Sequence, residues 1–301
     1  MKKETVLGYI RLMRPANLPT AMADILAGAT VAGAADLFLS SDTEPVLILK
    51  PLLFLVLASI CLYAGGVVLN DVFDFELDLK ERPERPIPSG KVSLKGAMLF
   101  GNLLLFLGVV LSFLVNNKCG IISILLVCSI LSYDAWAKHH KLFGPLNMGL
   151  CRGLNLLLGM AILGHFEQWW IMVIPVFYIA AITMISRGEV HGNNRSNIAL
   201  ASIIYGLVIL MILQLAIFGK HHILQVIPFI VVFAVMIYKP LLKAFKDNSP
   251  LNIKGAVKAG VIALIVMDAC IAAGFSQWWF SLGMLLLLPL SFVLSKQFAV
   301  T

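Results

Sequence analysis

The sequence predicts an all-α fold, a polytopic transmembrane helical bundle of nine to ten spans. Of its 301 residues, 60% are hydrophobic and 13% are charged, whereas soluble domains carry about 25% charged residues. Ten apolar segments come close to the roughly 20 residues that a helix needs to cross a bilayer. The polar links between these segments also differ strongly in charge. Together these observations indicate that lipid surrounds most of the chain.

The predicted spans follow one another with short links. No linker or change in composition divides the chain, so we expect one transmembrane domain over residues 1–301. Two links on one side, 73–94 and 243–254, are long enough to hold structure of their own. The spans are expected at 16–35, 51–72, 95–115, 119–137, 145–164, 169–186, 198–218, 222–242, 255–274 and 277–296.

The basic residues predict how these spans are oriented. With ten spans, both termini and every second link share one side, which carries 19 of the 23 lysines and arginines, and the other side carries Lys50, Lys118 and Lys220. Cytoplasmic links are the basic ones in membrane proteins. We therefore expect a multi-pass protein of a bacterial inner membrane with its N-terminus in the cytoplasm. Anionic lipid headgroups then account for the net charge of +7, and we expect no nucleic-acid partner.

The most charged stretch of the chain, NDVFDFELDLKERPERPIPSG at residues 70–90, directly follows the second span. Asp71, Asp74 and Asp78 are spaced i, i+3 and i+7, which places them on one helix face, with Asn70 beside them. Three like charges near a membrane repel one another and lose hydration, so a positive partner must neutralise them. Oxygen ligands of this kind suit Mg²⁺, which proteins usually hold through a few carboxylates and substrate phosphates.

Basic residues follow the aspartates. Arg82, Arg85 and Lys91 can contact phosphate oxygens, arginine as a bidentate fork and lysine as a point charge. The prolines and glycine of PERPIPSG indicate a stiff turn. The residues thus predict a site for a magnesium–diphosphate group. The plainer alternative is a solvated helix end with salt bridges among its own side chains, which is what runs of charge usually form.

This stretch resembles the first aspartate-rich motif of the UbiA superfamily of intramembrane prenyltransferases. Three further segments are similar to that family in the same order along the chain. They are RLMRPANLPT, with Arg14 and Asn17, at the start of the first helix, Tyr133 with Lys138 at the end of helix 4, and NMGLCRGLNLLLG, with Arg152 and Asn155, in helix 5.

The resemblance implies a bundle with a central cavity open sideways to lipid. There a polyprenyl diphosphate would bind Mg²⁺ through two aspartate motifs, on helices 2 and 6, and its prenyl group would pass to a small acceptor, often an aromatic ring. The implied metal ligands are Asn70, Asp71, Asp74, Asp78 and Glu189, and the implied catalytic residues are Asp71, Asp74, Tyr133, Arg187 and Glu189. The candidate diphosphate contacts are Arg14, Asn17, Asn70, Arg82, Arg85, Lys91, Lys138, Arg152, Asn155 and His191.

The second motif, over residues 185–192, departs from the family pattern D-x-x-G-D. Gly188 and Glu189 align with its Gly-Asp, which leaves Ile185 in place of the first aspartate, while Arg187 and His191 add basic groups. One interpretation is a single Mg²⁺ at helix 2, with Arg187 contacting phosphate in place of a second ion.

The other interpretation is that catalysis has been lost and that the cavity binds or exports a lipid-like or aromatic metabolite. SRGEVHG and the tenth span resemble the EboC-like branch of the superfamily, whereas the usual bundle of the family has nine helices.

Arg152, Asp24 and Asp268 lie well inside predicted spans, where an unpaired charge is costly. Arg152 is expected to face the cavity, with Asn155 one turn further on. Asp24 and Asp268 are expected either to hydrogen-bond within the bundle or to line a polar path.

Overall fold

The computed structural model describes residues 3–40, 44–190, 192–218 and 223–298, and in these ranges its regular secondary structure is entirely helical. The α-helices are α1 (Lys3–Leu12), α2 (Leu18–Val31), α3 (Ala34–Leu39), α4 (Pro45–Phe73), α5 (Phe75–Glu81), α6 (Leu94–Phe113), α7 (Asn117–Ala135), α8 (Phe143–Met160), α9 (Val173–Ser186), α10 (Arg195–Phe218), α11 (Ile223–Lys246), α12 (Pro250–Ala273), α13 (Trp278–Met284) and α14 (Leu287–Gln297). Short 3₁₀ helices are η1 (Pro15–Asn17), η2 (Ala137–His139), η3 (Ala161–Leu163) and η4 (Trp169–Met172).

The predicted bundle of nine to ten spans is confirmed. Within the described ranges, nine helical segments are long and apolar enough to cross a membrane, from Pro45–Phe73 to Trp278–Gln297, where α13 and α14 together form one span. The first predicted span, 16–35, holds the shorter α2 followed by α3. Gly33 lies between these two helices with φ 87°, a left-handed backbone that glycine adopts without steric cost, and this break divides the span.

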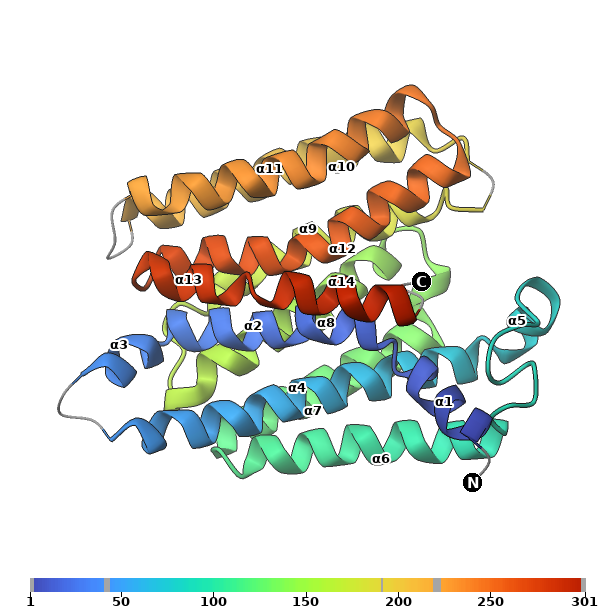
Figure 1. Cartoon of the computed structure of the whole chain (residues 1–301), viewed down its shortest axis with the longest axis horizontal. Helices are drawn as coiled ribbons and strands as arrows, with labels where there is room; N and C mark the ends of the chain where they lie inside the picture. Colours follow the sequence, from blue (N-terminus) through green and yellow to red (C-terminus); the bar gives the residue numbers. More distant parts are fainter. Residues whose placement is uncertain (1–2, 41–43, 191, 219–222, 299–301) are drawn as a thin grey trace.

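Helices α2, α8 and α12 occupy the middle of the bundle, and α2 packs against both of the others and against α4 (Figure 1). The backbones of α2 and α8 approach closely. A Cβ atom added to Gly28 would lie 2.3 Å from the carbonyl oxygen of Leu156, and one added to Gly159 would lie 2.6 Å from that of Ile25. Small residues therefore allow this crossing, as in other membrane bundles.

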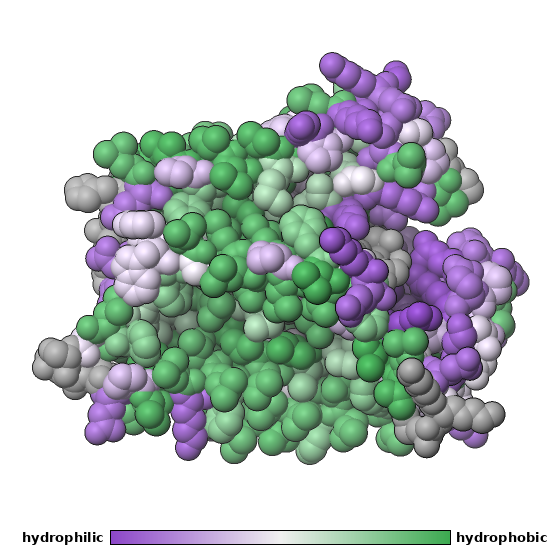
Figure 2. Space-filling view, viewed as in Figure 1, coloured by the Kyte–Doolittle hydropathy of each residue, from purple (hydrophilic) through white to green (hydrophobic). Residues whose placement is uncertain are grey.

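The outer surface separates into an apolar belt and polar ends. Figure 2 shows hydrophobic side chains across the middle of the molecule and most hydrophilic ones at the end where α1 and α5 lie. We call this end, formed by α5, the turn 83–90, η2 and residues 187–190, the polar end. Its surface is hollowed between two groups of hydrophilic side chains (Figure 2).

The turn after α5 is held by a small apolar cluster of its own. Ile87 and Val92 are buried against Leu12, Val68 and Ala97, which come from α1, α4 and α6. This packing fixes the turn against the bundle. Arg85, which lies in the turn, is thereby held near Asp71 at the end of α4.

Candidate functional site

The first aspartate motif lies where α4 gives way to α5. The two helices are separated only at Asp74, and the hydrogen-bond pattern continues across it, from Asp74 N to Asn70 O at 2.9 Å and from Asp78 N to Asp74 O at 2.8 Å. The aspartates therefore keep helical spacing, as predicted, although the helix is interrupted between them. Asp71 and Asp78 are buried, and Asp74 is partly exposed.

Three basic side chains from distant segments neutralise these carboxylates. Arg14 Nη2 lies 2.8 Å from Asp71 Oδ1, and Lys138 Nζ lies 2.5 Å from Asp74 Oδ1. Arg85 Nη1 joins two acids, at 3.2 Å from Asp71 Oδ1 and 2.6 Å from Asp78 Oδ2. The predicted diphosphate contacts Arg14, Arg85 and Lys138 are thus brought to the aspartates, where they form ion pairs.

Arg14 reaches Asp71 from a strained backbone. Its φ is 48°, in the left-handed region that costs a residue other than glycine on the order of 1 kcal/mol. The following η1 is held from the far end of the chain, because Ser291 Oγ of α14 donates a hydrogen bond to Ala16 O at 2.7 Å. Asn17 is buried in the same turn. The surrounding packing therefore maintains a conformation that directs Arg14 toward the motif.

The ion pairs leave one oxygen of each carboxylate for another partner. They involve Oδ1 of Asp71, Oδ1 of Asp74 and Oδ2 of Asp78, and within the described ranges no ion pair reaches the second oxygen of any of the three. Hard oxygen donors at the end of a membrane helix fit Mg²⁺, which is bound through one or two carboxylates together with phosphate oxygens. The donor type therefore fits the predicted cation, but among the described residues no three carboxylate, histidine or cysteine side chains converge into a formed metal site.

Asp78 shows that this end is partly withdrawn from water. Burial raises the pKa of Asp78 above its usual range, the hydrogen bond and charge of Arg85 act in the opposite direction, and the charges of Asp71 and Asp74 raise the pKa further. Loss of hydration thus outweighs the arginine, and another positive partner would favour the ionised form.

The end of α7 contributes a second layer of polar groups. Asn70 Nδ2 donates to Asp134 Oδ1 at 2.8 Å, and Asp134 is buried. Tyr133 lies near enough to Asp74 and Arg187 to interact with both electrostatically. Sequence reasoning missed Asp134, although it lies between the two residues of the recognised pair, four positions before Lys138.

The second motif lies across the polar end from the first. Arg187 is exposed and its Nη2 donates to His140 O at 2.9 Å, while Ile185 is buried. Burial raises the pKa of Glu189, and the charges of Lys254 and Arg82 lower it. Glu189 thus lies near the loop that follows the first motif. Its role as a metal ligand stays a prediction.

Two further candidate residues are less closely tied to the aspartates. Lys91 is exposed, and in the described part of the chain no ion pair joins it to the motif. His191 lies outside the described residues.

Arg152 and Asn155 belong to a different cluster, enclosed between α2, α4, α8 and α12. Arg152 Nε lies 2.7 Å from Asp24 Oδ2, and its Nη2 donates to Thr20 O. Asn155 Nδ2 donates to the same Asp24 oxygen at 2.7 Å and to Ala21 O at 3.0 Å. The partners of Arg152 are therefore in the bundle and not among the aspartates of the motif, because the buried Asp24 already offers a carboxylate. Its contact with substrate stays a prediction.

Asp268 completes this buried cluster. It is fully buried and lies close enough to Asp24 for the two carboxyl groups to interact. As ionised groups, both carboxyls would present oxygens without a donor, namely Asp24 Oδ1 and both oxygens of Asp268. A hydrogen bond between two carboxyl groups requires one shared proton, which leaves one negative charge for Arg152. Of the two expectations, the structure shows hydrogen bonding within the bundle for Asp24, and the role of Asp268 stays a prediction.

Fold and site together define an integral, multi-pass membrane protein. At its polar end one aspartate-rich motif forms ion pairs with basic side chains. The chain belongs to the UbiA prenyltransferase family, whose model matches residues 26–191.

Two curated relatives, both archaeal, illustrate the similarity. A digeranylgeranylglyceryl phosphate synthase of Methanococcoides burtonii is 35% identical over 160 residues, which cover 52% of this chain and 55% of that protein. The synthase of Sulfurisphaera tokodaii is 31% identical over 182 residues, 60% of this chain and 61% of that protein. The chain thus spans between half and two thirds of the length of these relatives.

Solved structures share the fold over most of the chain. A UbiA homologue from Archaeoglobus fulgidus bound to GPP and Mg²⁺ superposes with a TM-score of 0.65 at 16% identity, over 88% of this chain and 99% of that one. The apo UbiA homologue from Aeropyrum pernix K1 gives 0.64 at 17% identity, over 82% and 96%. The predicted family and fold are confirmed, and the closer affiliation with the EboC-like branch stays a prediction.

Proposed function

We propose that this protein transfers a prenyl group, within the membrane, from a prenyl diphosphate to a glycerophosphate-type lipid acceptor, and that the reaction depends on Mg²⁺. The observation that carries the proposal is the row of three aspartates, each with one oxygen outside the ion pairs that join it to Arg14, Arg85 or Lys138. Such a row can hold a cation and leave basic side chains for the diphosphate.

The residues of the polar end would act on the leaving group. When bound to Asp71, Asp74 and Asp78, Mg²⁺ would place positive charge against the diphosphate oxygens and stabilise them as they depart. Arg14, Arg85 and Lys138 would exchange part of their pairing with the aspartates for contacts to phosphate. Arg187, exposed beside Tyr133, would supply a fixed charge where the second motif lacks a carboxylate.

Tyr133 is the residue at this end best suited to face the allylic carbon. It is near enough to Asp74 and Arg187 to interact with both electrostatically, and an aromatic face attracts a developing cation. The bond from the allylic carbon to the diphosphate oxygen breaks, a bond to the acceptor hydroxyl oxygen forms, and the hydroxyl proton is released. A water-poor surrounding protects the cation from hydrolysis.

The acceptor is inferred from the relatives. Several of them are named digeranylgeranylglyceryl phosphate synthases, and that product name describes a glyceryl phosphate carrying two prenyl groups. This supports a lipid alcohol as the acceptor over the aromatic ring that the family resemblance also allowed.

The test is a reaction in detergent with geranylgeranyl diphosphate, Mg²⁺ and one acceptor at a time. We expect pyrophosphate release and a doubly prenylated product, identified by mass spectrometry, with geranylgeranylglyceryl phosphate. We expect no product with 4-hydroxybenzoate, an aromatic acceptor. Product only with the aromatic compound would overturn the acceptor and keep the reaction class.

A second candidate function is binding or export of a lipid-like or aromatic metabolite without chemistry. Ile185 favours it, because the second motif offers no carboxylate there. A non-hydrolysable prenyl thiodiphosphate would then stabilise the protein against heat, while geranylgeranyl diphosphate would release no pyrophosphate with either acceptor.

The 19-to-3 distribution of basic residues supports placing the polar end and the N-terminus in the cytoplasm. The identity of the membrane stays a prediction. The curated relatives described above are archaeal, so they offer no support for a bacterial inner membrane.

A further inference from the structure

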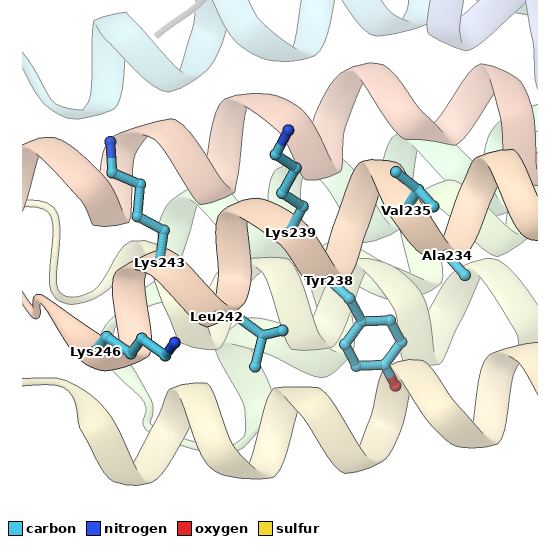
Figure 3. Close-up of a pocket in the computed structure, with 7 residues that line it drawn as sticks. All are labelled: Ala234, Val235, Tyr238, Lys239, Leu242, Lys243 and Lys246. Atoms are coloured by element: carbon cyan, nitrogen blue, oxygen red, sulfur yellow. The ribbon is translucent and has the colours of Figure 1, made fainter.

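A groove on α11 lies apart from the aspartate site. It has a volume of about 670 Å³ and is lined by Ala234, Val235, Tyr238, Lys239, Leu242, Lys243 and Lys246. Three lysines and an apolar strip thus share one side of a single helix (Figure 3).

The lysines form a row at the polar end of this helix. Lys239, Lys243 and Lys246 are spaced i, i+4 and i+7, which places them along one face over about 10 Å of helix. All three are exposed, and within the described ranges no ion pair reaches any of them. The neighbouring acid, Asp247, accepts a hydrogen bond from Asn252 at 2.6 Å. Asp247 therefore forms no ion pair with the row in the described part of the chain.

Apolar side chains continue the groove away from the lysines. Val235 and Leu242 are more than half exposed, on a helix at the edge of the bundle (Figure 1). Tyr238 points to the neighbouring helix α10, where its hydroxyl donates to Ser202 O at 2.9 Å, and this bond fixes the floor of the groove (Figure 3). Leu242 lies between two of the lysines, and Val235 lies one turn beyond Lys239, so the apolar surface begins among the lysines and continues past them (Figure 3).

A membrane setting makes the absence of a counter-charge costly. Lysines at a helix end extend their ammonium groups to the lipid headgroups, and each adds roughly 1 kcal/mol of attraction to an anionic surface. A phosphate diester at that level can contact two or three ammonium groups of one row at once. Its acyl chain would then lie along Val235 and Leu242.

We propose that this groove is a binding site for an anionic membrane phospholipid, with the phosphate held by Lys239, Lys243 and Lys246 and one acyl chain on the apolar strip. The site does not depend on the proposed reaction, because its residues come from α11 and none belongs to the aspartate motifs.

Native mass spectrometry of the full chain in neutral detergent, titrated with dioleoyl phosphatidylglycerol or dioleoyl phosphatidylcholine, tests the proposal. The key variant replaces all three lysines, K239Q/K243Q/K246Q. The matched control K95Q/K141Q/K296Q removes the same charge from three exposed lysines on separate elements. Since each lysine contributes about fivefold and the phosphate contacts two or three of them, we expect the key variant to lose about 25- to 125-fold in phosphatidylglycerol affinity, while the control stays near the wild type.

The arginine variant K239R/K243R/K246R controls for misfolding. It keeps the positive charge and should therefore keep the affinity for phosphatidylglycerol. Equal loss in the key variant and the control would overturn the proposal. So would displacement of phosphatidylglycerol by inorganic phosphate at equal concentration, which would show a site for a soluble anion. A dimer present in the wild type and absent from the key variant would assign the face to a second copy of the chain.

Discussion

Two regions of this protein contain several aspartates, and the surroundings of these side chains differ between the two regions. At the polar end, Asp71, Asp74 and Asp78 pair with three basic residues, and each keeps an oxygen outside those pairs. In the middle of the bundle, Asp24 pairs with Arg152, and both Asp24 and the neighbouring Asp268 are fully buried. The difference lies in the surroundings, because the motif belongs to the polar end whereas Asp24 and Asp268 are enclosed by helices of the bundle. An oxygen facing an open end can hold a ligand, whereas an enclosed one only satisfies its neighbours.

The largest expected effect comes from Asp71→Asn. The side chain keeps its shape but loses the charge that receives Arg14 and Arg85, so turnover should fall by about 10²–10³-fold. Pyrophosphate release measures this, and Mg²⁺-dependent thermal stabilisation by a prenyl thiodiphosphate should disappear with it. Asp36→Asn, on an exposed side chain of α3, is the control and should behave as the wild type. Near-normal turnover in Asp71→Asn would remove the motif from the reaction.

The double variant Asp24→Asn/Asp268→Asn should affect folding instead. It leaves Arg152 as an uncompensated buried charge, which costs about 3–5 kcal/mol of unfolding free energy. Denaturant titration in mixed micelles measures the loss. At temperatures where the variant is folded, prenyl thiodiphosphate affinity should be unchanged. If affinity fell without loss of stability, the buried cluster would belong to the substrate site, as the sequence had suggested for Arg152.

Arg187→Ala should have a moderate effect, confined to binding. Loss of one charged contact to phosphate weakens diphosphate affinity by about tenfold, even at saturating Mg²⁺. Arg195→Ala is the matched control, because Arg195 is also exposed and donates to a backbone carbonyl, Lys246 O, at 3.4 Å. Equal affinities in both variants would exclude Arg187 as the substitute for a second metal ion.

The smallest effect is expected for Asp268→Asn alone. Asparagine resembles a protonated aspartate and can donate to Asp24, so the single negative charge opposite Arg152 is retained. Unfolding free energy should change by less than about 1 kcal/mol. A loss as large as that of the double variant would show that Asp268 is the charged member of the pair.

The spans and the first aspartate motif of the site could be predicted from the sequence. Apolar runs of membrane length leave little choice of secondary structure, because an unsatisfied backbone cannot lie in lipid. The aspartate row and its basic neighbours were also predictable, since both occupy one polar link beside a span. The ion pairs between them were not the main prediction. Arg85 was expected to contact phosphate, whereas in the structure it pairs with Asp71 and Asp78.

The buried cluster could not be derived in the same way. Asp24, Arg152 and Asp268 lie on three different spans, and the rotation of each helix depends on packing that no local pattern encodes. Asp134 was missed for a related reason: its partner, Asn70, is 64 positions away.

The hydrogen bond from Ser291 to Ala16 joins the last helix of the chain to the turn that aims Arg14. Segments 275 positions apart in the sequence therefore meet beside the aspartate motif, although the family match stops at residue 191. Truncation before α14 would remove this hydrogen bond and with it part of the packing that maintains the left-handed backbone of Arg14. A change near the C-terminus would therefore alter a residue near the N-terminus.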